Sequence, residues 1–197
     1  EKNDYASLGF ADGSYYFLDE KGVVIDKGNL PPGNMVKGLR ISSNGKFGAV
    51  HYGSGEKDML RVVSIGKDDF EDSALMNSHP VKTAIHISDN GMTAIFDMDN
   101  VLVVDDDCDE LFKFKVPAKR PGQSVITKAA GYYYLVYTKN TGESQLVVFN
   151  SDGELFYSRE FAGESYLSAC VRGEGTVVRG SDSLFSYRIH VQGSNGI

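Results

Sequence analysis

Cysteine, tryptophan and long apolar runs are scarce or missing in this sequence. Its 197 residues include two cysteines, Cys108 and Cys170, and no tryptophan. Two cysteines are too few for a disulfide framework. Because one lies among acids and the other in an apolar run, we expect two free thiols. No apolar run approaches the roughly 20 residues that cross a bilayer, so we expect no membrane insertion by this segment.

Positive charge is also in deficit. The chain has 20 Lys and Arg against 27 Asp and Glu, a net charge of −7. Nucleic-acid binding depends on cations that neutralise phosphates, so we expect no nucleic-acid partner. The chain begins with Glu1 rather than Met, which favours a trimmed or mature segment. The compartment is unknown from the sequence, with an extracytoplasmic location slightly favoured.

Glycine-bearing turns recur at a nearly constant interval, which indicates an internal repeat. The turn glycines are Gly45, Gly91, Gly131 and Gly175, at spacings of 46, 40 and 44 residues. Two of the turns read Ser42-Ser43-Asn44-Gly45 and Ser88-Asp89-Asn90-Gly91. Glycine suits the positive φ of a tight hairpin turn. A short apolar run, which we name strand A, precedes each turn, and a second run, strand B, follows it.

Two further strands complete each repeat. Strand C shares a Val-Val pair in three copies, as expected of a buried strand, and strand D is more polar, as edge strands are. The C strands read LRVVSI (60–65), VLVVDD (101–106), QLVVFN (145–150) and LFSYRIHV (184–191). The D strands read FEDSALM (70–76), ELFKFKV (110–116) and ELFYSREF (154–161). No helical period stands out; a helical turn is plausible only around 70–76, where we favour a strand.

The first and last repeats are incomplete. Residues 5–10, 14–20 and 22–29 match strands B, C and D, so the first repeat lacks strand A. The last repeat stops after strand C and lacks strand D. Three explanations stay open: the two ends share one unit, the segment is cut from a larger ring, or a partner chain supplies strands.

The repeat resembles a known superfamily. Units of about 40–45 residues with four antiparallel strands are typical of propeller blades. The apolar run, Ser-x-Asn-Gly turn and second apolar run at 41–50 and 87–96 resemble the β-propeller repeat superfamily, most of all its quinoprotein-like or YVTN-type blades. The tryptophan of the quinoprotein docking motif is missing, so we expect no quinone and no other cofactor.

The resemblance implies an all-β fold, a β-propeller of about five four-stranded antiparallel blades. It predicts a single domain, or a segment of a propeller, with its hydrophobic core between blades. A β-sandwich is the alternative fold. The blades would span approximately 1–32, 33–78, 79–119, 120–163 and 164–197.

Candidate metal and catalytic residues do not form a recognisable set. An acidic run extends from Asp97 to Glu110, but Asp97 and Asp99 fall on a B–C loop while 105–110 fall on a C–D turn, at opposite ends of the repeat. We therefore interpret 105–110 as a solvated turn. His51 and His86 fall within strands and are expected to fill space between blades, whereas His79 is expected to be exposed. We predict no catalytic, cofactor-binding or metal-binding residue.

The favoured hypothesis is a non-catalytic domain that binds a protein or another ligand through its D–A and B–C loops. The candidate loop residues are His79, Pro80, Lys119 and Arg120. We expect a protein partner, and a homo-oligomer stays open. One alternative is a structural or assembly module completed by another chain. Another is a metal-dependent hydrolase or lyase, for which strand A offers mainly Arg40, His86 and Lys128.

Overall fold

A computed structural model gives the fold of the chain. It describes residues 5–67, 69–74, 77–79, 83–116, 124–139, 143–162, 168–172, 175–179 and 184–187. All regular secondary structure in these ranges is β-strand, including residues 69–74, where we preferred a strand to a helical turn. No helix long and apolar enough to span a membrane occurs among these residues.

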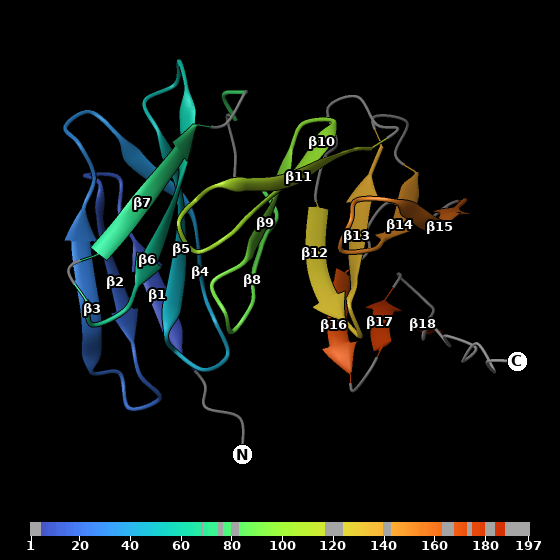
Figure 1. The fold of residues 1–197 in the computed structure, drawn as a ribbon, viewed down its shortest axis with the longest axis horizontal. Coiled ribbons are helices and arrows are strands. Elements are labelled where there is room, and N and C mark those ends of the chain that lie inside the picture. Colours follow the sequence, from blue (N-terminus) through green and yellow to red (C-terminus); the bar gives the residue numbers. More distant parts are fainter. Residues whose placement is uncertain are drawn as a thin grey trace, which may run out of the picture. The chain divides into compact units, whose positions relative to one another are not determined.

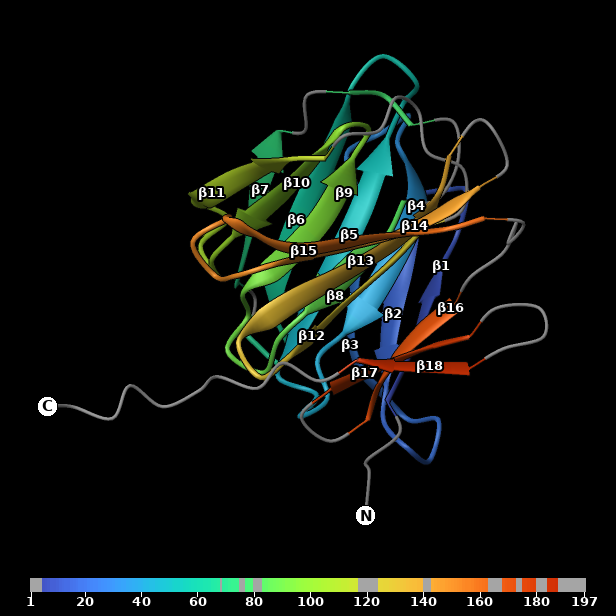
Figure 2. The same cartoon turned by 90° about the vertical axis from the view of Figure 1, so that its right-hand side faces the viewer.

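The strands form five separate antiparallel sheets, each in chain order (Figures 1 and 2). Sheet 1 contains β1 (Ala6–Gly9), β2 (Ser14–Leu18) and β3 (Val24–Asn29). Sheet 2 contains β4 (Met35–Ile41), β5 (Phe47–Gly53), β6 (Asp58–Ser64) and β7 (Asp69–Ala74). Sheet 3 contains β8 (Ile85–Ile87), β9 (Thr93–Asp97), β10 (Asn100–Val104) and β11 (Glu110–Lys115).

Sheets 4 and 5 complete the described structure. Sheet 4 contains β12 (Ser124–Ala129), β13 (Tyr132–Thr138), β14 (Ser144–Phe149) and β15 (Leu155–Phe161). Sheet 5 contains β16 (Ser168–Arg172), β17 (Gly175–Arg179) and β18 (Leu184–Tyr187). The four-stranded repeat is thus confirmed. The β-sandwich alternative is wrong, because the strands form five sheets rather than two.

The chain divides into two compact units, residues 1–121 and 122–197. Sheets 1, 2 and 3 belong to the first unit, and sheets 4 and 5 to the second. Each sheet falls within one of the five expected blade ranges. That all five make up one domain stays a prediction.

The hydrophobic core lies between neighbouring sheets, as the repeat predicts. Strand β5 shows why: successive side chains of a strand point to opposite faces, and both faces of this strand are buried. Ala49 packs with Leu60 and Ile95 in the core between sheets 2 and 3. Its neighbour Val50 packs with Phe17 in the core between sheets 1 and 2. Within the second unit, a third core joins sheet 4 to Val178, Phe185 and Tyr187 of sheet 5.

The Ser-x-Asn-Gly turns join sheets 2 and 3 at one end. Gly45 and Gly91 have φ values of 71° and 85°, as the turn prediction requires. The Ser43 hydroxyl donates to both Asp89 carboxylate oxygens, at 2.8 and 2.9 Å, and the Asn44 amide N–H donates to the same carboxylate at 2.9 Å. We call these three residues the turn link. It is exposed to solvent.

Candidate functional site

The B–C and D–A loops of the first unit lie at one end of its strands, opposite the turn link, because each sheet runs up and down in chain order (Figure 1). In the described residues, this end comprises 10–13, 30–34, 54–57, 77–79 and 98–99. We call it the loop face. Beneath it, between sheets 2 and 3, five charged or titratable side chains meet: Lys37, His51, Asp58, His79 and Asp97. We call them the loop clamp.

Asp58, the first residue of β6, is the centre of the loop clamp. Its carboxylate is fully buried. One oxygen accepts from the Lys37 ammonium at 2.5 Å. The other accepts from His51 Nε2 at 2.7 Å and from the backbone N–H of His79 at 2.9 Å. A buried carboxylate is tolerated because three donors replace its water.

The His79 loop is held from both sides. Lys37 Nζ donates to the His79 carbonyl oxygen at 2.7 Å, so both backbone polar groups of His79 bind residues of sheet 2. The His79 ring instead binds sheet 3, through Nε2 to Asp97 Oδ1 at 2.7 Å. Asn77 donates to the same Asp97 oxygen at 3.1 Å. This loop therefore connects two neighbouring sheets through charged hydrogen bonds.

Burial and charge set the protonation of the loop clamp. Burial lowers the pKa of His51 from 6.5 to about 4, although its bond to Asp58 opposes the change. Lys37 already balances the Asp58 charge, so a second cation at His51 would be in excess. Burial by itself raises the pKa of the Asp58 carboxyl, but the hydrogen bonds from Lys37, the His79 amide and His51 outweigh burial and keep it lowered.

This arrangement fastens loops rather than offering reactive groups. The side chains bind one another and are largely shielded from water, with Lys37, the most exposed of the five, at 10%. No group of three or more His, Cys, Asp or Glu among the described residues is placed to hold a metal ion.

The structure corrects one expectation about the candidate residues and leaves others untouched. The expected exposure of His79 is wrong: the residue is 7% exposed, because its backbone and ring are bound to both neighbouring sheets. Pro80, Lys119 and Arg120 lie outside the described residues.

Other candidates from the sequence do not join the loop clamp. His86 is half-buried between Ile85 and Ile87, and Arg40 donates to the Ile85 carbonyl oxygen at 3.4 Å. Lys128 lies in the second unit over the Tyr133 ring. Asp106, Asp107, Asp109 and Glu110 are exposed, which confirms that part of the acidic turn as solvated, and the Cys108 thiol is free and buried.

Sequence reasoning missed Lys37 and Asp58 and assigned no role to Asp97. A signal for the two acids exists. Asp58 opens strand β6, whose residues are mostly buried, and Asp97 closes the fully buried β9. An acid that directly borders a buried strand needs a partner, and a histidine in the adjoining D–A loop is a candidate.

Comparison with known proteins identifies the fold. No protein-family model matches the chain, and no curated protein matches it. Among solved structures, the chain is similar to the Cps50 (Swd1) β-propeller domain of Myceliophteria thermophila, with a TM-score of 0.60 and 11% identity over 93% of this chain and 66% of that one. A chain of a mitotic checkpoint complex has a TM-score of 0.61 and 8% identity, covering 88% of this chain and 53% of its own length.

A third similar structure is a protein of unknown function from Bacteroides caccae, with a TM-score of 0.55 and 14% identity over 96% of this chain and 70% of that one. The chain thus spans about two thirds of the first propeller domain and about half of the checkpoint chain. These likenesses show that the fold is a β-propeller, with the five sheets as blades. The finer likeness to quinoprotein-like or YVTN-type blades stays a prediction.

Proposed function

We propose that this chain is a non-catalytic β-propeller domain that binds another protein through the loop face. The observation that carries the proposal is the double attachment of the His79 loop, to Asp58 and Lys37 on one side and to Asp97 on the other. A binding surface made of loops gains affinity when the loops are ordered before the partner arrives, because less conformational entropy is lost on binding.

The loop clamp supplies this order from beneath the surface. The Lys37 ammonium, the Asp58 carboxylate and the Nε2 atoms of both histidines bond within the clamp, so the partner would contact the exposed residues above it, such as 54–57. Ser78 donates to the Gly55 carbonyl oxygen at 2.8 Å, which joins the His79 loop to this exposed segment. Pro80, Lys119 and Arg120 belong to the proposed surface on sequence grounds alone. A chain of a mitotic checkpoint complex among the similar structures is in keeping with a role in protein assembly.

The alternatives have less support. A metal-dependent hydrolase or lyase would need free ligands, whereas the acids and histidines of the loop clamp bind one another. An assembly module completed by another chain would act through strand edges rather than through the loop face. Substitutions on the loop face should weaken partner binding under the first hypothesis, whereas substitutions on strand edges should do so under the assembly hypothesis.

A pair of charge swaps tests the proposal. Glu56→Lys with Lys57→Glu reverses local charge on the loop face while keeping the net charge. Glu20→Lys with Lys21→Glu does the same at the opposite end of sheet 1, and all four residues are exposed. We expect the loop-face swap to reduce capture of the native partner by about tenfold and the control swap to leave it unchanged.

Lysine cross-links to the partner should involve Lys57 rather than Lys46, which lies in a turn at the far end. Equal capture by both swapped variants, or cross-links concentrated at Lys46, would refute the loop face as the contact surface.

A further inference from the structure

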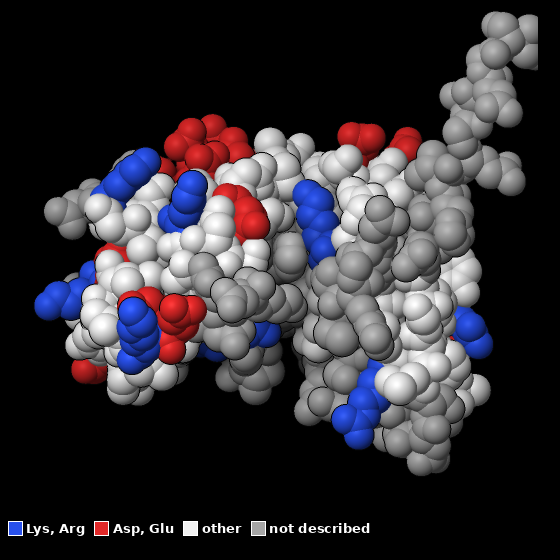
Figure 3. Space-filling view, turned by 90° about the horizontal axis from the view of Figure 1, so that it is seen from below, with Lys and Arg blue, Asp and Glu red and all other residues white. Residues whose placement is uncertain are grey.

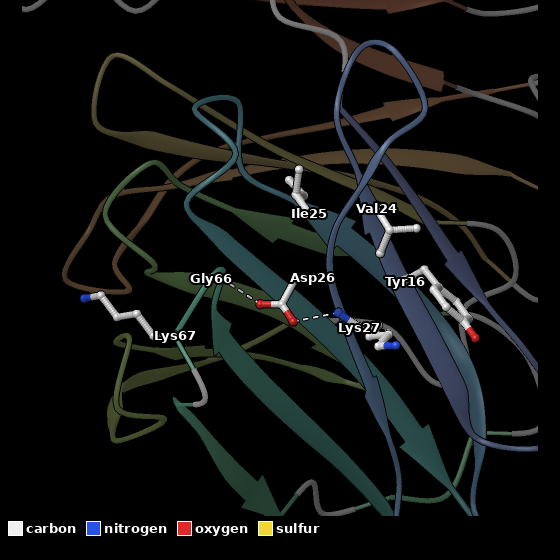
Figure 4. Close-up of a pocket in the computed structure, with 7 residues that line it drawn as sticks. All are labelled: Tyr16, Val24, Ile25, Asp26, Lys27, Gly66 and Lys67. Atoms are coloured by element: carbon white, nitrogen blue, oxygen red, sulfur yellow. Dashed lines mark hydrogen bonds between the residues drawn. The ribbon is translucent and has the colours of Figure 1, made fainter.

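A groove of about 580 Å³ lies away from the loop face, where the outer strand of sheet 1 meets the β6–β7 turn of sheet 2. Its volume is within the range of ligand-binding clefts. Figure 4 shows its lining: Tyr16, Val24, Ile25, Asp26, Lys27, Gly66 and Lys67. The backbone N–H of Gly66 donates to Asp26 at 2.8 Å, and this bond holds the turn against β3.

A β-bulge explains why four consecutive residues, 24–27, line one groove. In a regular strand, alternate side chains would point away. Here Phe17 pairs with Asp26 and Leu18 with Val24, so Ile25 is an extra, unpaired residue. Sheets 3 and 4 have the same irregularity, at Leu111 and Phe156. Bulges commonly redirect side chains beside binding sites, and in sheet 1 the bulge lies next to a turn that completes a groove.

The groove combines an apolar floor with two cations. Val24, which lines the groove, is 48% exposed, so its side chain is available to an occupant. Among the described side chains, no carboxylate forms an ion pair with Lys27 or Lys67. The carboxylate of Asp26 is already engaged, because it accepts from the Gly66 and Lys27 backbone N–H groups. What distinguishes Lys27 and Lys67 from other exposed lysines is that both line the groove beside its apolar residues.

We propose that this groove binds an extended peptide segment of another protein in which acidic side chains alternate with apolar ones. Figure 4 shows Lys27 and Lys67 on opposite sides of Asp26, so an occupant that meets both lysines has to extend past Asp26. An extended chain can place one carboxylate at each lysine and its apolar side chains on Val24 and Ile25, which line the same groove. Recognition is through side chains, because the bulge and Lys27 disfavour simple strand addition to the edge of β3.

Figure 3 gives the electrostatic setting. On the face that it shows, lysine and arginine side chains are interspersed with aspartate and glutamate, without one broad basic field among the described residues. At the groove itself, the cations available to an acidic peptide are Lys27 and Lys67. The pattern of its side chains, rather than its total charge, would decide binding.

The test uses fluorescence anisotropy of a fluorescein-labelled six-residue peptide in which glutamate and leucine alternate. We expect the intact chain to bind this peptide, and to bind it about tenfold more tightly than a peptide with serine in place of leucine. Lys27→Glu with Lys67→Glu should weaken binding about tenfold. Lys21→Glu with Lys46→Glu, exposed lysines outside the groove, makes the same change of net charge and should have no effect. Lys27→Gln with Lys67→Gln provides a milder variant should the reversal disturb folding.

Several results would overturn the proposal. Equal affinity for the leucine and serine peptides would show that the apolar side chains do not contribute to binding. An equal loss of affinity in the groove and control variants would show that binding depends only on the overall charge of the chain. Absence of binding to the intact chain would refute it outright. Self-association of the chain that the Lys27→Glu and Lys67→Glu substitutions abolish would assign the groove to a second copy instead. Because the groove is separate from the loop face, the Glu56 and Lys57 swap should leave peptide affinity unchanged, so each proposal can fail without the other.

Discussion

Sheets 2 and 3 are joined at both ends by polar contacts, and the two joints differ in burial. At the loop end, the buried carboxylate of Asp58 accepts three hydrogen bonds. At the turn end, the exposed carboxylate of Asp89 also accepts from several donors, on Ser43 and Asn44. The number of contacts is similar, but the loop end is buried and includes the Lys37 ammonium, whereas the donors at the turn end are neutral.

Burial changes how much stability is lost when the carboxylate of the loop clamp or of the turn link is removed. Water can replace the partners of an exposed carboxylate, whereas a buried cation or N–H that loses its acceptor is left without one. The loop clamp should therefore respond strongly to substitution and to acid, and the turn link only weakly. Three predictions test this contrast, from the largest expected effect to the smallest.

Replacing Asp58 by Ala should have the largest effect. The substitution leaves the His79 N–H without its acceptor and the Lys37 ammonium with the His79 carbonyl oxygen but no carboxylate, at a cost of about 3–5 kcal/mol in the free energy of unfolding. Urea unfolding at neutral pH measures the loss. Asp58→Asn keeps the size and one acceptor oxygen, so it should cost less than Ala. A loss below about 1 kcal/mol for Asp58→Ala would mean that water enters the loop clamp freely.

Acid should have the next largest effect, through His51. Its pKa is about 4 in the folded chain against 6.5 for the free side chain, so the unfolded chain takes up the proton first. The stabilising contribution is complete above pH 6.5 and is lost as the pH falls to about 4, at a cost of about 3 kcal/mol. The lowered pKa of Asp58 acts in the same direction at still lower pH, below its ordinary value of 3.8.

The pH dependence of unfolding in the wild type and in His51→Gln provides the measurement. Glutamine does not titrate, so the variant should lack this part of the loss between pH 6.5 and 4 while keeping the contributions of other groups. Identical pH dependence in the two proteins would show that His51 is not held neutral by burial.

Replacing Asp89 by Ala should have the smallest effect. Its hydrogen bonds to Ser43 and to the half-buried Asn44 are exposed, so water can replace the carboxylate, and we expect a loss of at most about 1 kcal/mol by urea unfolding. The loss should be unchanged between pH 7 and 5, because no histidine belongs to the turn link. A loss comparable to that of Asp58→Ala would contradict the role given to burial.

The sequence was sufficient to predict the sheets because their signals are local. Turn glycines such as Gly45 and Gly91 mark the hairpins, and the Val-Val pairs mark the buried strands. The loop clamp was not predictable in the same way. Its members come from strands β4, β5, β6 and β9 and from the loop before β8, and they meet only once neighbouring sheets pack.

His79 illustrates the limit. A histidine before a proline in a connecting loop has the local character of an exposed residue, and local character was all that the sequence offered. Its burial depends on Asp58 and Asp97, which lie 21 and 18 residues away. The groove beside β3 was missed for a similar reason, since a bulge at Ile25 and a turn at Gly66 contribute to it from two repeats.

The burial of both faces of β5 limits which repeats can be deleted or inserted in such a chain. Deletion of the second repeat would remove the residues of sheet 2 that pack against Phe17 on one side and Ile95 on the other. Gain or loss of a repeat should therefore keep the chain stable only when the two sheets that become neighbours have complementary apolar faces. The interface between two repeats, rather than either repeat alone, is therefore the unit that has to be kept intact.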